Sequence, residues 1–306
     1  MPCRNDILLG TRAFENLATS IKIKIGHYSI STTRYAGRIL MFQENITRLT
    51  EGENEGGEGV EMALKRLKKT ESLPDEVTEA MEALKKFCEG VTGQWRFPSQ
   101  RILGRIVRSP SITFGAGKEG FTEDYAIVEL DTSKFKKSFV GNAIDLGMKI
   151  PDYEFTLKIC PHIDAQMIFK YPYDRLLKVR GIISEDQLRR PDMLDRDGES
   201  CLFVIKSGKV TGITIGRATG IFSYVRQYFP NNTHQTSKEW AILPYDSKSG
   251  AFSAPGDSGS IIVNGSGESG GFLTGGAGKT ESSDVTYATP FYWLYPRIQA
   301  NWSPKF

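Results

Sequence analysis

Histidine and cysteine are scarce in this sequence, and long apolar runs are absent. It has three histidines and four cysteines in 306 residues, and Cys3, Cys88, Cys160 and Cys201 form no CxxC pair of the kind that binds zinc or supports redox chemistry. No apolar run reaches the roughly 18 residues that indicate a membrane-spanning helix, and the first residues lack the apolar stretch of a secretory signal. The net charge of +3 is too small to indicate a nucleic acid or an anionic membrane as partner.

These absences favour a soluble protein of the cell interior, with the cytoplasm as the expected location and with reduced thiols. No set of His, Cys, Asp and Glu residues has the spacing of a metal site, so no bound metal is expected. The fragments GKEG and GGAGK lack the spacing of a phosphate-binding loop, and no cofactor is expected either. The expected partners are polypeptides, with no nucleic acid and no membrane.

Residues 14–92 have the spacing of helices that pack against each other. Apolar-type positions first recur at steps of four and three, at Ile21, Ile25, Tyr28, Thr32, Tyr35, Ile39, Phe42, Ile46 and Leu49. After the glycine-rich linker EGENEGGEG the spacing returns, at Val60, Leu64 and Leu67, and then at Val77, Met81, Leu84, Cys88 and Val91. Pro74 and Asp75 predict a new helix start near Ser72. We predict an antiparallel coiled-coil hairpin whose two seams bury each other, with a partner-binding coiled coil as the alternative.

Beyond Pro98 the apolar pattern changes to a period of two, which is typical of β-strands. The predicted strands are short and rich in Val, Ile and aromatic residues: RILGRIVR, DYAIVEL, FTLKI, CLFVIK, VTGITIG, EWAILP, SGSIIVN and DVTYAT. Many short strands with glycine turns favour a barrel or a sandwich over a parallel sheet. The polar segment 184–200 is the predicted boundary between two β halves. The final TPFYWLYPRIQANW predicts a short amphipathic helix with Pro296 near its middle.

The segment SAPGDSGSII places Ser258 in a Gly-Asp-Ser-Gly frame, the setting of an activated serine nucleophile. Gly256 and Gly259 permit a tight backbone and Asp257 can cap the turn, so a plain turn before a strand also explains these residues. Three neighbouring features favour the catalytic interpretation. An apolar strand follows directly, the glycine-rich strand GGFLTGGAG comes after a short spacer, and a further strand and a helix close the chain.

That order of elements resembles the second barrel of the trypsin/chymotrypsin-like serine proteases, the PA clan. Upstream, FTEDYAIVEL resembles the strand that carries the triad acid, and IKSGKVTGITIGRATGIFSYV resembles the strands that open the second barrel. The chain is also similar to uncharacterised trypsin-like proteins of fungi, some of which carry a long helical insertion. The resemblance covers about 101–148 and 201–298, roughly half of the chain.

The resemblance implies a mainly β fold with a chymotrypsin-like double β-barrel. The first barrel is expected to be incomplete, an antiparallel α-helical hairpin is inserted in it, and a short C-terminal helix follows the second. The predicted division is a remnant of the first barrel at 1–13, the hairpin insertion at 14–92, the rest of the first barrel at 93–183, a linker at 184–200, and the second barrel with the nucleophile at 201–306.

The resemblance also assigns roles to residues near the motif. Ser258 would be the nucleophile, Asp124 the acid that orients the base, and the backbone amides of Gly256 and Ser258 the oxyanion hole. Asp257 pairs in secreted relatives with a newly cut N-terminal amine. No such cleavage site is evident in this sequence, so the partner of Asp257 stays open, with a local turn role as the alternative.

Substrate-binding residues follow from the same resemblance. Thr274, Gly275 and Gly276 would form the strand on which an extended peptide can add by β-augmentation. Phe252 stands six residues before the nucleophile, where it would form the base of the primary specificity pocket. A phenylalanine there predicts a filled or apolar pocket, and not one for Lys or Arg.

The catalytic base is the part that the sequence does not supply. The family order is His, Asp, Ser; His27 precedes Asp124 but lies in the predicted helix, where a solvated histidine is the simpler interpretation. His162 follows Asp124 and breaks that order, and His234 lies in a predicted loop, although triads are recognised by geometry rather than order. In the proteins that the chain resembles, the histidine precedes the helical insertion. We therefore expect that the base has been lost, or that the sequence as given starts after it.

These observations predict a trypsin-like serine endopeptidase domain that hydrolyses peptide bonds through an acyl-enzyme on Ser258. Its activity is expected to be impaired or absent because the histidine is not evident. The alternative is a pseudoprotease that serves as a protein-binding module, and a third hypothesis is a structural protein in which GDSG is a turn. Self-association through the hairpin or through an open barrel edge is a further prediction.

Overall fold

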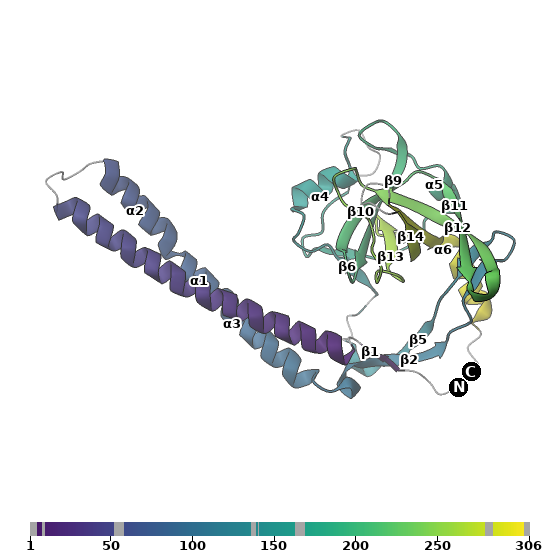
Figure 1. The fold of residues 1–306 in the computed structure, drawn as a ribbon, viewed down its shortest axis with the longest axis horizontal. Coiled ribbons are helices and arrows are strands. Elements are labelled where there is room, and N and C mark those ends of the chain that lie inside the picture. Colours follow the sequence, from purple (N-terminus) through teal and green to yellow (C-terminus); the bar gives the residue numbers. More distant parts are fainter. Residues whose placement is uncertain are drawn as a thin grey trace. The chain divides into compact units, whose positions relative to one another are not determined.

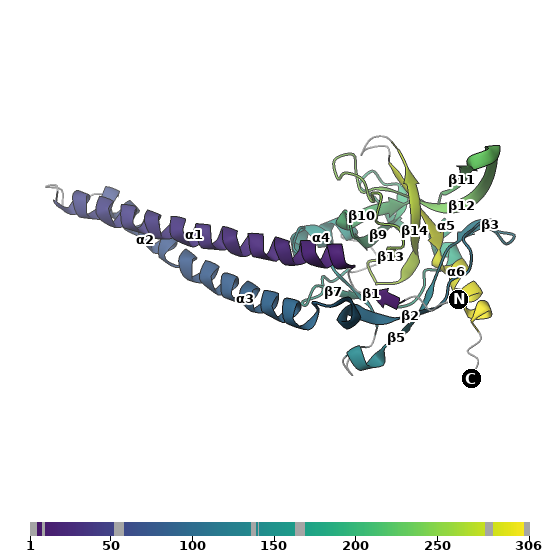
Figure 2. The ribbon, with the colours of Figure 1, turned by 60° about the horizontal axis from the view of Figure 1, so that its bottom comes forward.

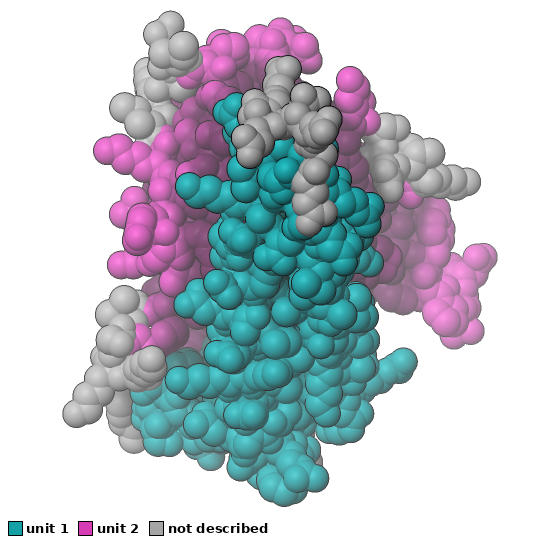
Figure 3. Space-filling view, turned by 90° about the vertical axis from the view of Figure 1, so that its left-hand side faces the viewer, with its two compact units in different colours: residues 1–108, 127–135 teal, residues 109–126, 136–306 magenta. Residues whose placement is uncertain are grey.

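The computed structural model describes residues 5–7, 10–51, 58–135, 139, 141–162, 169–278 and 284–302. The chain divides into two compact units, drawn in separate colours in Figure 3. Unit 1 comprises residues 1–108 and 127–135, and unit 2 comprises residues 109–126 and 136–306. The predicted first-barrel region, 93–183, is therefore shared between the two units.

Three helices make up most of unit 1. They are α1 (Thr11–Glu51), α2 (Glu58–Glu71) and α3 (Leu73–Gln94). Figures 1 and 2 both show α2 and α3 lying one after the other along α1, in a hairpin. The predicted break falls at Ser72, because Pro74 lies in the first turn of α3 and has no backbone N–H to extend α2. Residues 52–57 of the predicted linker lie outside the described residues.

Burial along the hairpin follows the predicted seams with two exceptions. On α1, Ile21 is buried and the seam positions from Ile25 to Ile46 are half-buried, whereas Leu49 is exposed. On α2, Ala63 is buried and Leu64 is 49% exposed, so the predicted seam position at Leu64 is wrong by one residue. A small residue at Ala63 allows close approach of the helix backbones, and the larger leucine is left facing outward.

Unit 1 also contains a three-stranded antiparallel sheet. Its strands, in the order β1-β2-β5, are β1 (Asn5–Ile7), β2 (Ile102–Arg108) and β5 (Ile127–Leu130). A 3-10 turn at Pro98–Arg101 leads from α3 into β2. The buried Arg101 guanidinium donates to the carbonyls of Trp95 at 2.6 Å and Arg96 at 2.8 Å, which satisfies carbonyl groups near the end of α3. A second short turn, Thr132–Lys134, follows β5.

Unit 2 is built on one ten-stranded sheet. Eight of its strands follow the order β10-β9-β13-β14-β15-β12-β4-β3, while β11 pairs with β12 and β8 with β9. The strands are β3 (Thr113–Ala116), β4 (Phe121–Glu123), β8 (Met193–Leu194), β9 (Ser200–Gly208), β10 (Gly212–Ala218), β11 (Phe222–Phe229), β12 (Thr233–Pro244), β13 (Ile261–Asn264), β14 (Ser269–Ala277) and β15 (Val285–Pro290). Because β10 also pairs with β12, the pairings of β9, β10, β12, β13, β14 and β15 form a closed cycle.

Shorter elements complete unit 2. They are a two-stranded sheet of β6 (Ala143–Asp145) and β7 (Leu176–Lys178), the helices α4 (Asp152–Ile159), α5 (Glu185–Arg189) and α6 (Phe291–Asn301), and a 3-10 turn at Pro230–Asn232. The predicted C-terminal helix is α6, and Pro296 lies inside it. The mainly β prediction with a helical hairpin and a C-terminal helix is confirmed.

A sequence-based expectation for unit 2 is wrong. FTLKI is not a strand but the larger part of α4, whose first turn carries Asp152 and Glu154. Phe155 and Ile159 are both fully buried, and their spacing of four places them on one helix face. The polar segment 184–200, the predicted linker between the β halves, contains α5 and β8, and its Leu188 is 1% exposed.

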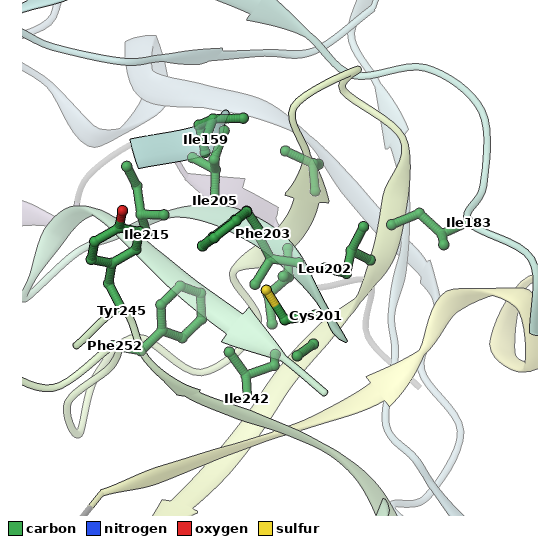
Figure 4. Close-up of a cluster of buried hydrophobic side chains, with 14 of the residues drawn as sticks. Ile159, Ile183, Cys201, Leu202, Phe203, Ile205, Ile215, Ile242, Tyr245 and Phe252 are labelled. Carbon is green, nitrogen blue, oxygen red and sulfur yellow. The ribbon is translucent and has the colours of Figure 1, made fainter. Parts of the chain in front are cut away.

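The core of unit 2 lies between the strands of the closed cycle. Figure 4 shows its centre, where Cys201, Phe203 and Ile205 of β9 meet side chains of β10 and β12 and the buried Phe252. Strand β9 has six consecutive buried residues, from Cys201 to Lys206, so it is covered on both faces. Cys88, Cys160 and Cys201, the cysteines that the structure describes, form no disulfide.

Candidate active site

The loop that carries the GDSG motif is held by the carboxylate of Asp257, which is 1% exposed. Its Oδ1 accepts from the backbone N–H of Val210 at 2.7 Å and of Thr211 at 3.4 Å. Its Oδ2 accepts from the Thr211 hydroxyl at 2.7 Å and from the Ala254 N–H at 3.2 Å. Asp257 therefore ties its own loop to the turn between β9 and β10.

Lys206 is the charged partner of Asp257. Its Nζ lies 3.3 Å from Asp257 Oδ2, and both side chains are fully buried. The same ammonium donates to the Thr211 hydroxyl and, at 3.2 Å, to the Gly212 carbonyl. The partner that the sequence left open is thus supplied by strand β9 of the chain itself, and Asp257 makes the local turn contact as well.

The protonation of this pair follows from its surroundings. Burial alone would raise the pKa of Asp257, but hydrogen bonds from Thr211, Val210 and Ala254, together with the Lys206 charge, lower it to about 2. Burial lowers the pKa of Lys206, although the attraction of Asp257 opposes this. Asp257 is therefore expected to be a carboxylate at neutral pH.

Two glycines make room for this arrangement. A Cβ atom on Gly208 would lie 2.4 Å from Asp257 Cγ, closer than any side chain could tolerate. Gly256 has φ of +105°, and a Cβ there would lie 2.8 Å from Val210 Cγ2. Glycine at both positions is required by space, and at Gly256 also by the backbone conformation.

With Asp257 turned inward, the next residue turns outward. Ser258 is exposed, and its hydroxyl makes no hydrogen bond to any described residue. In the described part of the chain the amides of Gly256 and Ser258 also donate to no acceptor, whereas the Asp257 N–H donates to the Ala254 carbonyl at 3.0 Å. Two free amides beside a free hydroxyl are what an oxyanion hole and its nucleophile require.

A cavity of about 360 Å³ opens beside Ser258. Besides Ser258, its lining consists of Ser253, Ala254, Pro255, Leu273, Gly275, Gly276, Ala277, Gly278 and Asp284. The predicted substrate residues Gly275 and Gly276 thus share this cavity with Ser258, the predicted nucleophile. Phe252 is not among the lining residues; it is 1% exposed in the core (Figure 4), where its carbonyl accepts from Thr214 at 2.7 Å.

The candidate acid, Asp124, directly follows β4 and is exposed. The residues just before it are fixed, because the buried Glu123 pairs with Arg297 of α6 and the Thr122 carbonyl accepts from Thr289 at 2.8 Å. Among the described residues, the structure shows no hydrogen bond or ion pair of Asp124 with a histidine or with Ser258.

The three histidines have other surroundings. His27 is exposed on α1 in unit 1, and His162 bonds through Nε2 to the Asp195 carbonyl at 2.8 Å. The predicted loop position of His234 is wrong, because His234 lies on β12. It is exposed there, and its ring centroid lies 6.1 Å from that of Tyr228. Within the part of unit 2 that the structure describes, neither His162 nor His234 is bonded to Ser258 or Asp124.

Thr274, the third predicted substrate residue, contacts a buried carboxylate. Its hydroxyl lies 3.4 Å from Oε2 of Glu239, which is 3% exposed, and 3.2 Å from the Tyr287 carbonyl. Glu239 Oε1 also accepts from the hydroxyls of Thr122 at 2.5 Å and Ser237 at 2.7 Å. Burial raises the pKa of Glu239, although these hydroxyls oppose it.

Glu239→Gln is expected to stabilise the protein at pH 7. The pKa of Glu239 is higher in the folded state than the ordinary value of 4.5. The free energy of unfolding therefore falls as the pH rises from 4.5 toward the raised pKa. Glutamine stays neutral and removes that loss, on the order of 1 kcal/mol per pKa unit. Urea unfolding at pH 4 and pH 7 tests this, with the exposed Glu76→Gln as control; a variant less stable than wild type at both pH values would contradict it.

Three residues of the site were not found from the sequence. One signal in the sequence could have indicated Lys206. It is the only charged residue in the apolar segment CLFVIK, and a charged side chain in a fully buried strand needs a partner. Glu239 is the first residue of the predicted strand EWAILP, and this short segment does not show which face of the strand is buried. Asp284 follows a polar stretch and gives no local signal.

Comparisons with known proteins give distant similarities. A scan against protein-family models and a search of curated proteins give no match. Among solved structures, a glutamic acid-specific serine protease is 16% identical, with 65% of this chain and 72% of that one covered at a TM-score of 0.35. The chymotrypsin of Cellulomonas bogoriensis is 19% identical, with 65% and 77% covered at a TM-score of 0.32. Protease A of Thermobifida fusca is 16% identical, with 65% and 88% covered at a TM-score of 0.32.

These proteins are chymotrypsin-like serine proteases, the class that the sequence resembles, whereas the similarity to fungal proteins stays a prediction. No helix among the described residues is long and apolar enough to cross a membrane. The described residues also contain no group of three or more His, Cys, Asp and Glu side chains that could hold a metal ion.

Proposed function

We propose that the Ser258 loop is the acylation site of a serine endopeptidase-type domain and that hydrolysis by this chain is impaired. The observation that carries this proposal is the anchored loop. The buried Asp257–Lys206 pair fixes its inner side, and Ser258, whose hydroxyl bonds to no described residue, lines a cavity. The amides of Gly256 and Ser258 donate to no described acceptor either. A plain turn before a strand requires neither a buried ion pair nor a cavity.

The chemistry explains the expected impairment. Ser258 Oγ would attack the carbonyl carbon of a peptide bond, while the amides of Gly256 and Ser258 stabilise the oxygen anion. A base must take the hydroxyl proton and return it to the leaving amine nitrogen as the C–N bond breaks. Water then releases the acyl group from Ser258. Since no base contacts Ser258 within the described residues, attack is expected to be slow.

A binding module without turnover, a pseudoprotease, is the alternative, and β14 favours it. Gly275 and Gly276 pair with Tyr287 and Thr286 of β15 on one side. On the other side the ladder with β13 ends at Phe272, and the Leu273 backbone bonds to Gly259 and Ser260. Beyond Leu273 no described strand pairs with this edge, and an extended peptide can add there by main-chain hydrogen bonds.

A fluorophosphonate probe with intact-mass detection tests the acylation site. Ser258 Oγ attacks phosphorus, fluoride leaves, and the hydroxyl proton passes to the solvent. We expect slow labelling that disappears in Ser258→Ala and persists in His27→Ala. The matched control is Ser247→Ala, which removes another exposed serine of unit 2.

The rate separates the possible outcomes. Without a base, labelling should be at least about 10³-fold slower than that of an active trypsin run in parallel. Labelling as fast as trypsin's would contradict the proposed impairment and would mean that another base is present. No Ser258-dependent adduct at all would reject the acylation site and leave the binding module.

A further inference from the structure

Part of the described lining of the cavity beside Ser258 has little or no side chain. Gly275, Gly276 and Gly278 have no side chain and Ala277 has only a methyl group, so this part of the lining leaves space. A Cβ placed on Gly275 would meet nothing within 4 Å. The lining also includes Ala254, Pro255 and Leu273, which are apolar. The slot therefore suits a side chain with a narrow aliphatic stem.

One described side chain gives the slot a charge. Asp284 precedes β15, lines the cavity and is half-buried. Its Oδ1 lies 3.8 Å from the position that a Cβ on Gly276 would occupy, so the carboxylate lies beside the glycine-rich part of the lining. None of the described residues forms an ion pair with Asp284, whereas the other carboxylate of this site, Asp257, has its ammonium partner.

An unpaired carboxylate in a partly buried cavity is costly, because a charge that leaves water needs a compensating charge or hydrogen bonds. Burial raises the pKa of Asp284, although a hydrogen bond from the Val285 N–H opposes this. A cation that enters the cavity would supply the counter-charge that none of the described residues provides. An anionic side chain would be repelled, and a neutral apolar one would leave the carboxylate desolvated without a partner.

From this geometry we infer that the cavity takes the cationic side chain of a lysine or arginine, and that Asp284 is the residue that selects it. The selected residue is the one whose carbonyl group lies at Ser258, since Ser258 lines the same cavity. The aliphatic stem packs against Leu273 and Pro255, and the charged end reaches Asp284. This inference rests on the proposed function for its substrate class, a polypeptide. It replaces the apolar pocket that the sequence predicts from Phe252, which does not line the cavity.

Binding of labelled peptides tests the inference without requiring turnover. Fluorescein-labelled Ala-Ala-Pro-X-Ala-Ala peptides, with X as Arg, Lys, Leu or Glu, are titrated with the full chain carrying Ser258→Ala, and Kd is read by fluorescence anisotropy. We expect the Arg and Lys peptides to bind at least tenfold tighter than the Leu peptide, and the Glu peptide to bind weakest.

Three variants assign the selectivity to the cavity. Asp284→Asn should bring the Arg-to-Leu ratio of Kd values close to one and leave the Leu peptide unchanged. Asp186→Asn removes an equal charge from the exposed helix α5 and should leave the ratio as it was. Gly275→Leu fills the open slot and should weaken all four peptides. Thermal melts establish that each variant is folded.

The outcomes separate this inference from the proposed function. Leu or Glu peptides that bind as well as Arg peptides, a ratio unchanged by Asp284→Asn, or no binding of any peptide would each overturn the inference. Arg selectivity without any Ser258-dependent fluorophosphonate adduct would support the inference and reject the acylation site. Ser258 labelling without selectivity for Arg or Lys peptides would support the acylation site and overturn the inference.

Discussion

Asp257→Ala is expected to lower the free energy of unfolding by about 3–5 kcal/mol, the cost of breaking a buried ion pair by removal of one partner. The variant leaves the Lys206 ammonium fully buried with the Thr211 hydroxyl and the Gly212 carbonyl as acceptors. It also removes the acceptor for the amides of Val210 and Ala254. Urea unfolding at pH 7 measures the loss. Arg190→Gln, which breaks an exposed pair with Asp186, is the control and should cost at most about 1 kcal/mol.

A double variant tests whether the loss of stability comes from the unpaired Lys206 ammonium. Lys206→Met in the Asp257→Ala background removes the buried ammonium and should recover part of the stability. The pH dependence is a second readout. Because the pKa of Asp257 falls from 3.8 to about 2 on folding, the advantage of wild type over Asp257→Ala is fully present above pH 3.8 and shrinks as the pH falls toward 2. A double variant that loses the sum of the two single losses would contradict the ion-pair explanation.

Gly208→Ala is expected to displace the Ser258 loop. The new methyl carbon would lie 2.4 Å from Asp257 Cγ, and Asp257 cannot move aside without giving up its hydrogen bonds and its Lys206 partner. Overpacking of this kind costs about 1–3 kcal/mol, and the loss of the Asp257 contacts adds to it. Urea unfolding measures the stability, and the fluorophosphonate probe reports on the loop.

Gly275→Ala provides the matched control for stability, since it adds the same methyl group in a strand of the same sheet but meets nothing within 4 Å. Its unfolding free energy should stay within about 0.5 kcal/mol of wild type, as is usual for a substitution that disturbs no contact. If Gly208→Ala were as stable as Gly275→Ala and were labelled at Ser258 at the wild-type rate, the anchoring role of Asp257 would be rejected.

Much of the fold follows from local spacing. The steps of four and three along α1 and α3, and Pro74 after Ser72, fix the helices, because a helix presents one face at that period and a proline cannot extend the preceding helix. The period of two predicts β9, β10, β12, β13 and β15 of unit 2, because alternate residues of a strand point to opposite faces of the sheet. The strand prediction for FTLKI was wrong because five residues fit both periods. In the structure the segment is helical, with acidic residues in the first turn and with Phe155 and Ile159 buried on one face.

Part of the site also follows from the sequence, and the rest from the tertiary structure. The sequence by itself determined where the Ser258 loop lies, because the glycines around Ser258 are a local backbone requirement, and it determined that β14 follows as a glycine-rich strand. Only the tertiary structure decided that Lys206 is the partner of Asp257 and that Asp284 shares a cavity with Ser258. The physical reason is that periodicity tells which face of a strand is buried, whereas the residue opposite is chosen by strand order and register across the whole sheet.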